Sequence, residues 1–236
     1  MPRIGFDRFI ALDWASAALR VRAGMAELDD LNILLDDAGL GVAARKKTRT
    51  VLNRLWLEPR PELADFAERG IEIYRANPGP PLSVFTWGMA VASYPFFGKV
   101  AELVGRLSAL QGDCASAEIH RRMSEVYGER EGTYRMTNMV LQSQASWGGI
   151  ERVDKGKRLI RMEPVMLSDA EIVAWLLESA LRYGGKKIPV STLSSLAVLY
   201  PFALHQPLGY VASQSPHLTI HSEGQGNQMV GVRASE

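Results

Sequence analysis

The chain has 236 residues, of which 47% are hydrophobic, and a formal net charge of +1 at pH 7. This length and composition suffice for one large domain or two small ones around a sizeable core, so extensive disorder is excluded. The small net charge does not decide for or against nucleic acid, because basic residues gathered on one face still attract phosphate.

Helical spacing of apolar residues predicts three helices before residue 80. The first runs from Ser16 to Asp37 and ends at Gly39, and the second runs from Val42 to Leu57. Pro61 opens the third, which continues through Tyr74. The proline- and glycine-rich break at 77–81 then makes the best linker candidate in the chain.

The second of these helices combines a buried apolar face with a strongly basic one. Its cations are Arg45, Lys46, Lys47, Arg49 and Arg54. Two readings stay open: a second phosphate-contacting patch, or the exposed side of an ordinary amphipathic helix. The patch would add to a nucleic-acid interface only if the fold brought it to the same side.

The middle of the chain begins with Leu82–Ala92, which is apolar on nearly every side and predicts a buried helix. The aromatic corner Tyr94-Pro95-Phe96-Phe97 follows, and then a helix over Lys99–Leu110. Aromatic side chains can stack on bases, but their place between two apolar helices favours the core.

Two more helices and a hairpin complete this region. The helices are Ser116–Tyr127, with Ser116 as a plausible N-cap, and Thr133–Ser146. The strands Ile150–Val153 and Arg158–Met162 are joined by a four-residue turn that contains a glycine. Three helices followed by a basic hairpin are the order of a winged helix-turn-helix.

Side chains suited to nucleic acid gather on the second and third helices of this unit and on its wing. The candidates for base edges are Arg135, Asn138 and Gln142. The candidates for phosphate are Arg121, Arg122, Lys155, Lys157 and Arg158, with Arg152 in the wing and Arg45, Lys46 and Lys47 in the second patch. The alternative is a solvated charged surface without a ligand.

The C-terminal region predicts a second, smaller unit. Ser168-Asp169-Ala170-Glu171 resembles a capping box that opens a helix ending at Gly184-Gly185. A short helix over Ser191–Leu199 and a hairpin of His217–Ser222 with Gln228–Val232 follow. This unit is either a degenerate second winged fold or a support for the first. The expected regions are therefore 1–80, 81–165 and 166–236.

Catalytic and metal-binding patterns are weak. His217 and His221 share one face of a predicted strand near Glu223, but the sequence specifies no third ligand. Cys114 and His120 lack an orienting third group. We expect no catalysis, no metal and no cofactor.

The single cysteine excludes an internal disulfide and indicates a reducing compartment, so a cytoplasmic protein is expected. No apolar stretch is long enough to span a bilayer, and we expect no membrane partner. The sequence leaves the oligomeric state open.

The aromatic corner also carries a family resemblance. A mostly helical chain of this size, with Tyr94-Pro95-Phe96-Phe97 leading into a helix and then a basic helical pair, resembles the BrxA-like family over residues 16–165. Proteins of that family are small DNA-binding components of the BREX phage-defence systems. The resemblance implies a DNA-binding accessory protein without catalytic activity, while the long C-terminal extension departs from the family.

The predicted protein is mainly α: a helical bundle with a central winged helix-turn-helix and a small C-terminal helix-plus-hairpin unit. Its expected partner is double-stranded DNA, with protein partners in a defence complex. The alternative is a protein-interaction module with no nucleic-acid contact. An exposed apolar patch around Trp56, Trp147 or Trp175 would favour that alternative.

Overall fold

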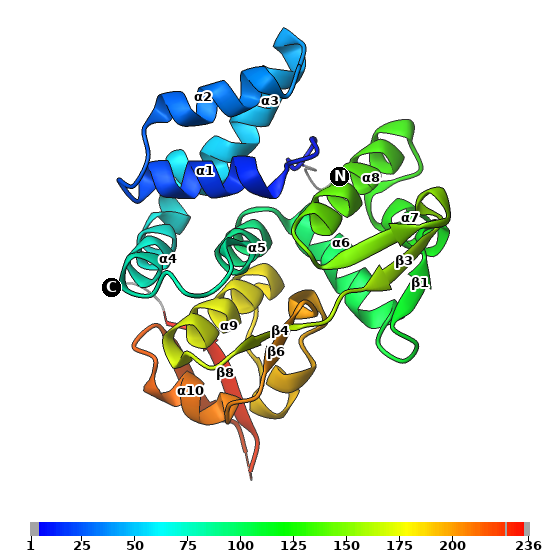
Figure 1. The fold of residues 1–236 in the computed structure, drawn as a ribbon. Helices are drawn as coiled ribbons and strands as arrows, with labels where there is room; N and C mark the ends of the chain where they lie inside the picture. Colours follow the sequence, from blue (N-terminus) through cyan, green and yellow to red (C-terminus); the bar gives the residue numbers. More distant parts are fainter. Residues whose placement is uncertain (1–4, 225, 234–236) are drawn as a thin grey trace.

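The structure is a computed structural model that describes residues 5–224 and 226–233. The chain is mostly helical and carries small sheets, which confirms the expected mainly α class (Figure 1). Among the described residues, no helix is long and apolar enough to cross a membrane.

The N-terminal helices differ from the prediction at one point. In order they are α1 (Leu12–Arg22), α2 (Leu28–Asp37), α3 (Val42–Leu52), η1 (Asn53–Leu57), η2 (Pro61–Leu63) and α4 (Ala64–Ala76). The single helix expected over 16–37 is wrong. The chain turns at Gly24, whose φ is 71°, and the carboxylate of Asp30 then accepts the backbone N–H of Glu27 at 2.9 Å. That capping contact starts α2 as a separate helix.

The middle region follows the predicted order closely. Its elements are α5 (Leu82–Ser93), α6 (Pro95–Leu107), β1 (Asp113–Ala115), α7 (Ser116–Tyr127), α8 (Glu131–Ser146), β2 (Ile150–Val153), η3 (Asp154–Gly156) and β3 (Arg158–Arg161). The short strand β1 was not predicted, and it pairs antiparallel with β3 on the side opposite β2. The N-cap assignment of Ser116 is wrong, because Ala115 holds that position without a side-chain cap.

The C-terminal region has more elements than the sequence suggested. They are β4 (Val165–Leu167), α9 (Ala170–Gly184), β5 (Ile188–Pro189), η4 (Val190–Ser195), η5 (Ala197–Leu199), β6 (Phe202–Leu204), α10 (Leu208–Gln214), β7 (Leu218–Ser222) and β8 (Gln228–Val232). The helix expected over 191–199 is instead two short 3-10 segments, and α10 was not predicted. The hairpin β7–β8 is confirmed.

The start of α9 corrects a second capping assignment. Asp169, rather than Ser168, is the N-cap, and its carboxylate accepts the N–H groups of Glu171 and Ile172 at 2.9 and 3.1 Å. The end of the helix is as expected, because Gly185 takes the left-handed conformation at φ 63°.

Two segments of the fold share one topology. In residues 95–161 a helix, a strand, two helices and a hairpin follow one another, and the sheet order is β1-β3-β2. In residues 170–232 the order is helix, strand, helical turns, the additional strand β6, helix and hairpin; β6 pairs with β4, and the sheet order of the other strands is β5-β8-β7. In each sheet the last strand therefore lies between the other two.

A contiguous buried core joins the N-terminal helices to both segments. Near its centre Trp87 of α5 makes edge contacts with Phe97, Trp147 and Tyr200 at ring-centroid distances of 5.2, 6.2 and 5.3 Å. Its indole N–H donates to the carbonyl of Val198 at 2.9 Å. Figure 1 shows α5 at this junction, between the N-terminal helices and the rest of the chain.

The aromatic corner belongs to this core. Tyr94, Phe96 and Phe97 are all buried, and the Tyr94 hydroxyl donates to the carbonyl of Val51 at 3.1 Å. These rings are therefore not available to stack on bases in this fold. Because Trp56, Trp147 and Trp175 are also buried, they provide no exposed apolar patch. That particular support for the interaction-module alternative is absent.

Candidate nucleic-acid interface

Helix α8 presents a mixed outer surface because its inner face is taken up by the core. Thr133, Met136, Val140 and Leu141 are buried on the inner side. On the other side Tyr134 and Arg135 are exposed, while Asn138 and Gln142 are half-buried. Of the three predicted base-reading residues, Arg135 is the most accessible.

The hairpin β2–β3 carries its two lysines at the turn. Lys155 and Lys157 are exposed, and neither has an ion-pair partner within residues 5–224 and 226–233. The turn is left-handed, with φ of 52° at Asp154, 58° at Lys155 and 82° at Gly156. Such a turn holds the lysines at the tip of the hairpin, where they can meet a phosphate backbone.

Arg158 is the first residue of β3, and unlike the two lysines it has ion-pair partners among the described residues. Its guanidinium lies 3.4 Å from the carboxylates of both Asp113 and Asp154. Because all three side chains are at least partly exposed, these pairs are weak and can exchange for a phosphate.

Arg152, which was expected to contact phosphate, instead holds the hairpin against α8. Its guanidinium donates to the Asn138 side chain on α8 at 2.8 Å, and burial lowers its pKa. The turn closes over it, since a Cβ at Gly156 would lie 2.6 Å from a guanidinium nitrogen. Arg152 and Asn138 thus fasten the hairpin to α8, and neither points freely at a ligand.

The arginines of α7 are largely neutralised by their own helix. Arg121 pairs with Glu118 and Glu125, and Arg122 pairs with Glu118 at 2.6 Å. The two arginines hold the pKa of the Glu118 carboxyl at about 2. The i,i+3 and i,i+4 spacing of these glutamates and arginines predicts the ion pairs from the sequence alone. Counting the cations without the glutamates overlooked them.

A further side chain on α8 was missed by the sequence reasoning. Tyr134 is 60% exposed, and its ring stacks on His120 of α7 with centroids 4.0 Å apart and planes 19° apart. Burial, together with the charge of Arg152, lowers the pKa of His120, which keeps the imidazole neutral at pH 7. The stack gives α8 an exposed aromatic surface next to Arg135.

The second basic patch lies on a different part of the fold. Figure 1 shows α3 among the blue and cyan N-terminal helices, apart from the green segment that holds α8 and the hairpin. Arg45 is paired with Asp36 of α2. Lys46 and Lys47 are exposed and have no ion pair with any residue that the structure describes.

The fold does not support the metal candidates His217 and His221 or the nucleophile candidate Cys114. Within the described ranges, no three His, Cys, Asp or Glu side chains are placed to hold a metal ion. The His221 imidazole is 3.0 Å from the hydroxyl of Thr219 instead. Burial and the charge of Asp113 raise the pKa of the Cys114 thiol to about 11, so it is protonated at neutral pH.

Comparisons with protein-family models, with curated proteins and with solved structures found no match for this chain. What the interface binds therefore has to be inferred from its own geometry.

Proposed function

We propose that the chain is a non-catalytic double-stranded DNA-binding protein and that residues 95–161 act as a winged helix. The observation that carries this proposal is the hairpin tip, where Lys155 and Lys157 are exposed and unpaired within the described residues. They follow the helix that exposes Arg135. In a winged helix such a helix enters the major groove while the wing contacts the backbone.

The charge of this segment supports the proposal. Residues 131–161 contain six Lys or Arg and three Asp or Glu, although the whole chain is nearly neutral. Each lysine or arginine that reaches a phosphate releases condensed counterion, so the segment favours DNA even without sequence readout. Arg135 and Gln142 are the proposed base-side residues, and Lys155, Lys157 and Arg158 the proposed phosphate-side residues.

The test is binding to a mixed-sequence duplex, followed by fluorescence anisotropy at about 50 and 200 mM salt. The variant Lys155→Ala/Lys157→Ala should weaken binding to all sequences and reduce the slope of log K against log salt by about 2. The matched control is Lys186→Ala/Lys187→Ala, which removes two exposed lysines after α9 and should change neither quantity.

A further variant separates free cations from neutralised ones. Arg121→Ala/Arg122→Ala should weaken binding much less than the hairpin variant, because both arginines already pair with glutamates. Equal losses in the hairpin variant and in the Lys186/Lys187 control would refute the assignment of the wing.

A place in a phage-defence complex is proposed on the family resemblance alone.

The interaction-module alternative keeps one supporting observation. Helix α2 exposes Leu28, Ile33 and Leu34 by 42%, 57% and 37%, and Val42 at the start of α3 is 90% exposed. Next to these apolar side chains, α2 is acidic and α3 is basic, so two copies could pair α2 with α3 reciprocally. In this alternative the chain self-associates in sedimentation velocity and does not bind the duplex, and Ile33→Asp should abolish the self-association.

A further inference from the structure

The C-terminal segment repeats the topology of the first but not its charge. Between Leu208 and Val232, which include α10 and the hairpin β7–β8, the sequence contains no lysine and no arginine. The corresponding stretch of the first segment contains six. The C-terminal helix and hairpin are therefore not built to attract phosphate, and a different ligand has to be sought there.

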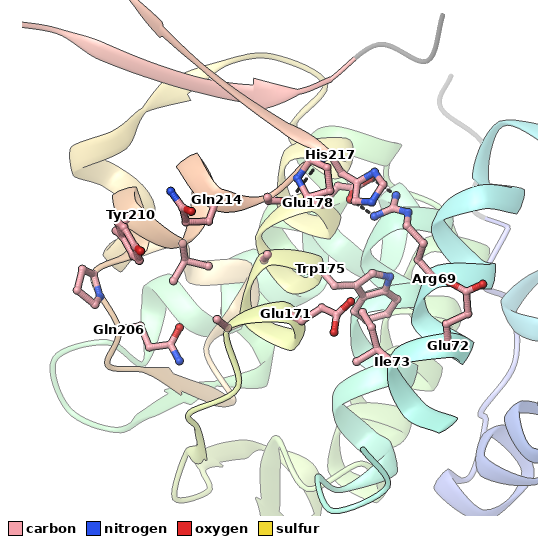
Figure 2. Close-up of a pocket in the computed structure, with 16 residues that line it drawn as sticks. Arg69, Glu72, Ile73, Glu171, Trp175, Glu178, Gln206, Tyr210, Gln214 and His217 are labelled. Carbon is pink, nitrogen blue, oxygen red and sulfur yellow. Dashed lines mark hydrogen bonds and ion pairs between the residues drawn. The ribbon is translucent and has the colours of Figure 1, made fainter. Parts of the chain in front are cut away.

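A cavity of about 580 Å³ lies between α4, α9 and α10. Figure 2 shows Tyr210, Gln214 and Gln206 on one side of it and Ile73, Glu72 and Arg69 on the other, with α9 between them. Cavities of this size commonly hold small molecules. The cavity spans from the N-terminal helices to the C-terminal segment.

The lining is mainly apolar and aromatic. Ile73, Trp175 and Val211 are buried, whereas Tyr210 is 65% exposed. Tyr210 therefore lies at the mouth of the cavity. Because its ring is not packed in the core, it can cover a bound molecule without a loss of core packing. Ala170 and Ala174 of α9 have only methyl side chains and leave the space beside them open.

The polar groups of the lining are mostly acceptors. The Oε1 atom of Gln206 is buried and has no hydrogen-bond partner in the described part of the chain. Glu72 and Glu171 also lack ion-pair partners among the described residues. Both carboxylates are exposed, so a ligand N–H group in the cavity can reach them, whereas Gln206 Oε1 is covered by protein.

The one arginine among the described lining residues is already paired. Both terminal nitrogens of Arg69 donate to the carboxylate of Glu178, at 2.7 and 2.8 Å. Burial and the charge of Arg69 lower the pKa of His217, so its imidazole adds no positive charge at pH 7. Among the described residues of the lining, an anion would find no free cationic group, whereas a cation would find two unpaired carboxylates.

We propose that this cavity is a binding site for a small organic cation, namely an apolar or aromatic body that carries a protonated amine. The amine is balanced by the carboxylates of Glu171 and Glu72, which have no ion-pair partner among the described residues. The body lies against Ile73 and Val211, and the ring of Tyr210 covers it at the mouth (Figure 2). This site is separate from the proposed DNA interface and does not depend on it.

Two probes of the same shape and opposite charge test the proposal on the full chain: 2-phenylethylamine and 3-phenylpropanoate, titrated by isothermal calorimetry. The amine should bind saturably, and the carboxylate should not. Glu171→Gln should weaken binding of the amine about three- to fivefold, as expected for one partly exposed ion pair. Tyr210→Ala should weaken it as well, and Ala174→Leu should abolish it by filling the cavity.

The controls separate ligand binding from folding. Glu163→Gln removes an exposed carboxylate outside the lining and should leave the affinity for the amine unchanged. The exposed positions Glu171 and Tyr210 keep the test valid if Ala174→Leu fails to fold. Equal or tighter binding of the carboxylate, no saturable binding of the amine, or an unchanged affinity in Glu171→Gln would each overturn the proposal.

Discussion

The buried carboxylate of Glu178 offers the sharpest test of how the C-terminal segment is held to the N-terminal helices. Only 1% of this side chain is exposed, and it accepts two hydrogen bonds from Arg69 on α4 and one from Arg182 on α9, at 2.7–2.8 Å. Both guanidinium groups also lie over the ring of Phe66, at 5.7 and 5.3 Å from its centroid.

Glu178→Ala should lower the free energy of unfolding by about 3–5 kcal/mol, because it leaves two guanidinium groups facing one another without an anion. Three charge-assisted hydrogen bonds at about 1.5–3 kcal/mol each would give a larger sum. Roughly a fifth of each arginine side chain is exposed, however, so water partly replaces the lost acceptor. The lower range is therefore expected.

The measurement is urea unfolding of the full chain with linear extrapolation. Glu178→Gln keeps one acceptor oxygen and should lose less than the alanine variant. Glu163→Ala, on the surface, should stay within about 0.5 kcal/mol of the parent. A loss below about 1 kcal/mol in Glu178→Ala would show that the two arginines find other partners and that this reasoning about buried charge fails here.

Three further outcomes follow from packing and protonation. Gly88→Ala should destabilise the fold by about 1–3 kcal/mol in the same urea assay, because its Cβ would lie 2.2 Å from a ring carbon of Trp175. Burial alone would raise the pKa of Glu102, but the hydroxyl of Tyr183 and two nearby cations lower it overall. The carboxylate therefore stabilises the fold above its ordinary pKa and loses that effect as the pH falls, so Tyr183→Phe should flatten the decline of Tm below pH 4.5. Cys114, with its pKa raised to about 11, should react with a disulfide reagent at pH 7 far more slowly than free cysteine does, and an equal rate would contradict its burial.

Elements with a strong local pattern were predictable from the sequence. Apolar spacing predicted α4, α5 and α7 to α9 to within about three residues and α6 three to four residues too late, and the glycine-containing turns predicted both hairpins. The elements that were missed depend on distant partners. The three-residue strand β1 exists because Cys114 lies opposite Leu159, and β4 because it pairs in parallel with β6. Such short segments have no period that a sequence window could detect.

The candidate interface was predictable in outline but not in its details. The sequence supplied the cations, yet it did not show that Arg152 is held by Asn138 or that Tyr134 stacks on His120. Those contacts depend on how α7, α8 and the hairpin meet. The organic-cation cavity is less visible still, because α4, α9 and α10 are far apart in the chain.

The first described residues form hydrogen bonds with residues much later in the chain, and this affects how the protein folds while it is being synthesised. The carbonyl of Ile10 accepts the indole N–H of Trp147, 137 positions further on, and the N–H of Ile10 donates to the hydroxyl of Ser143. At about 5–20 residues per second, a ribosome needs roughly 7 to 27 seconds to make the intervening chain. During that time Phe6 and Ile10, which are fully covered in the finished fold, have no native partner from α8. The nascent chain therefore has a long interval in which a chaperone can bind its beginning, and slow translation before Trp147 would lengthen it.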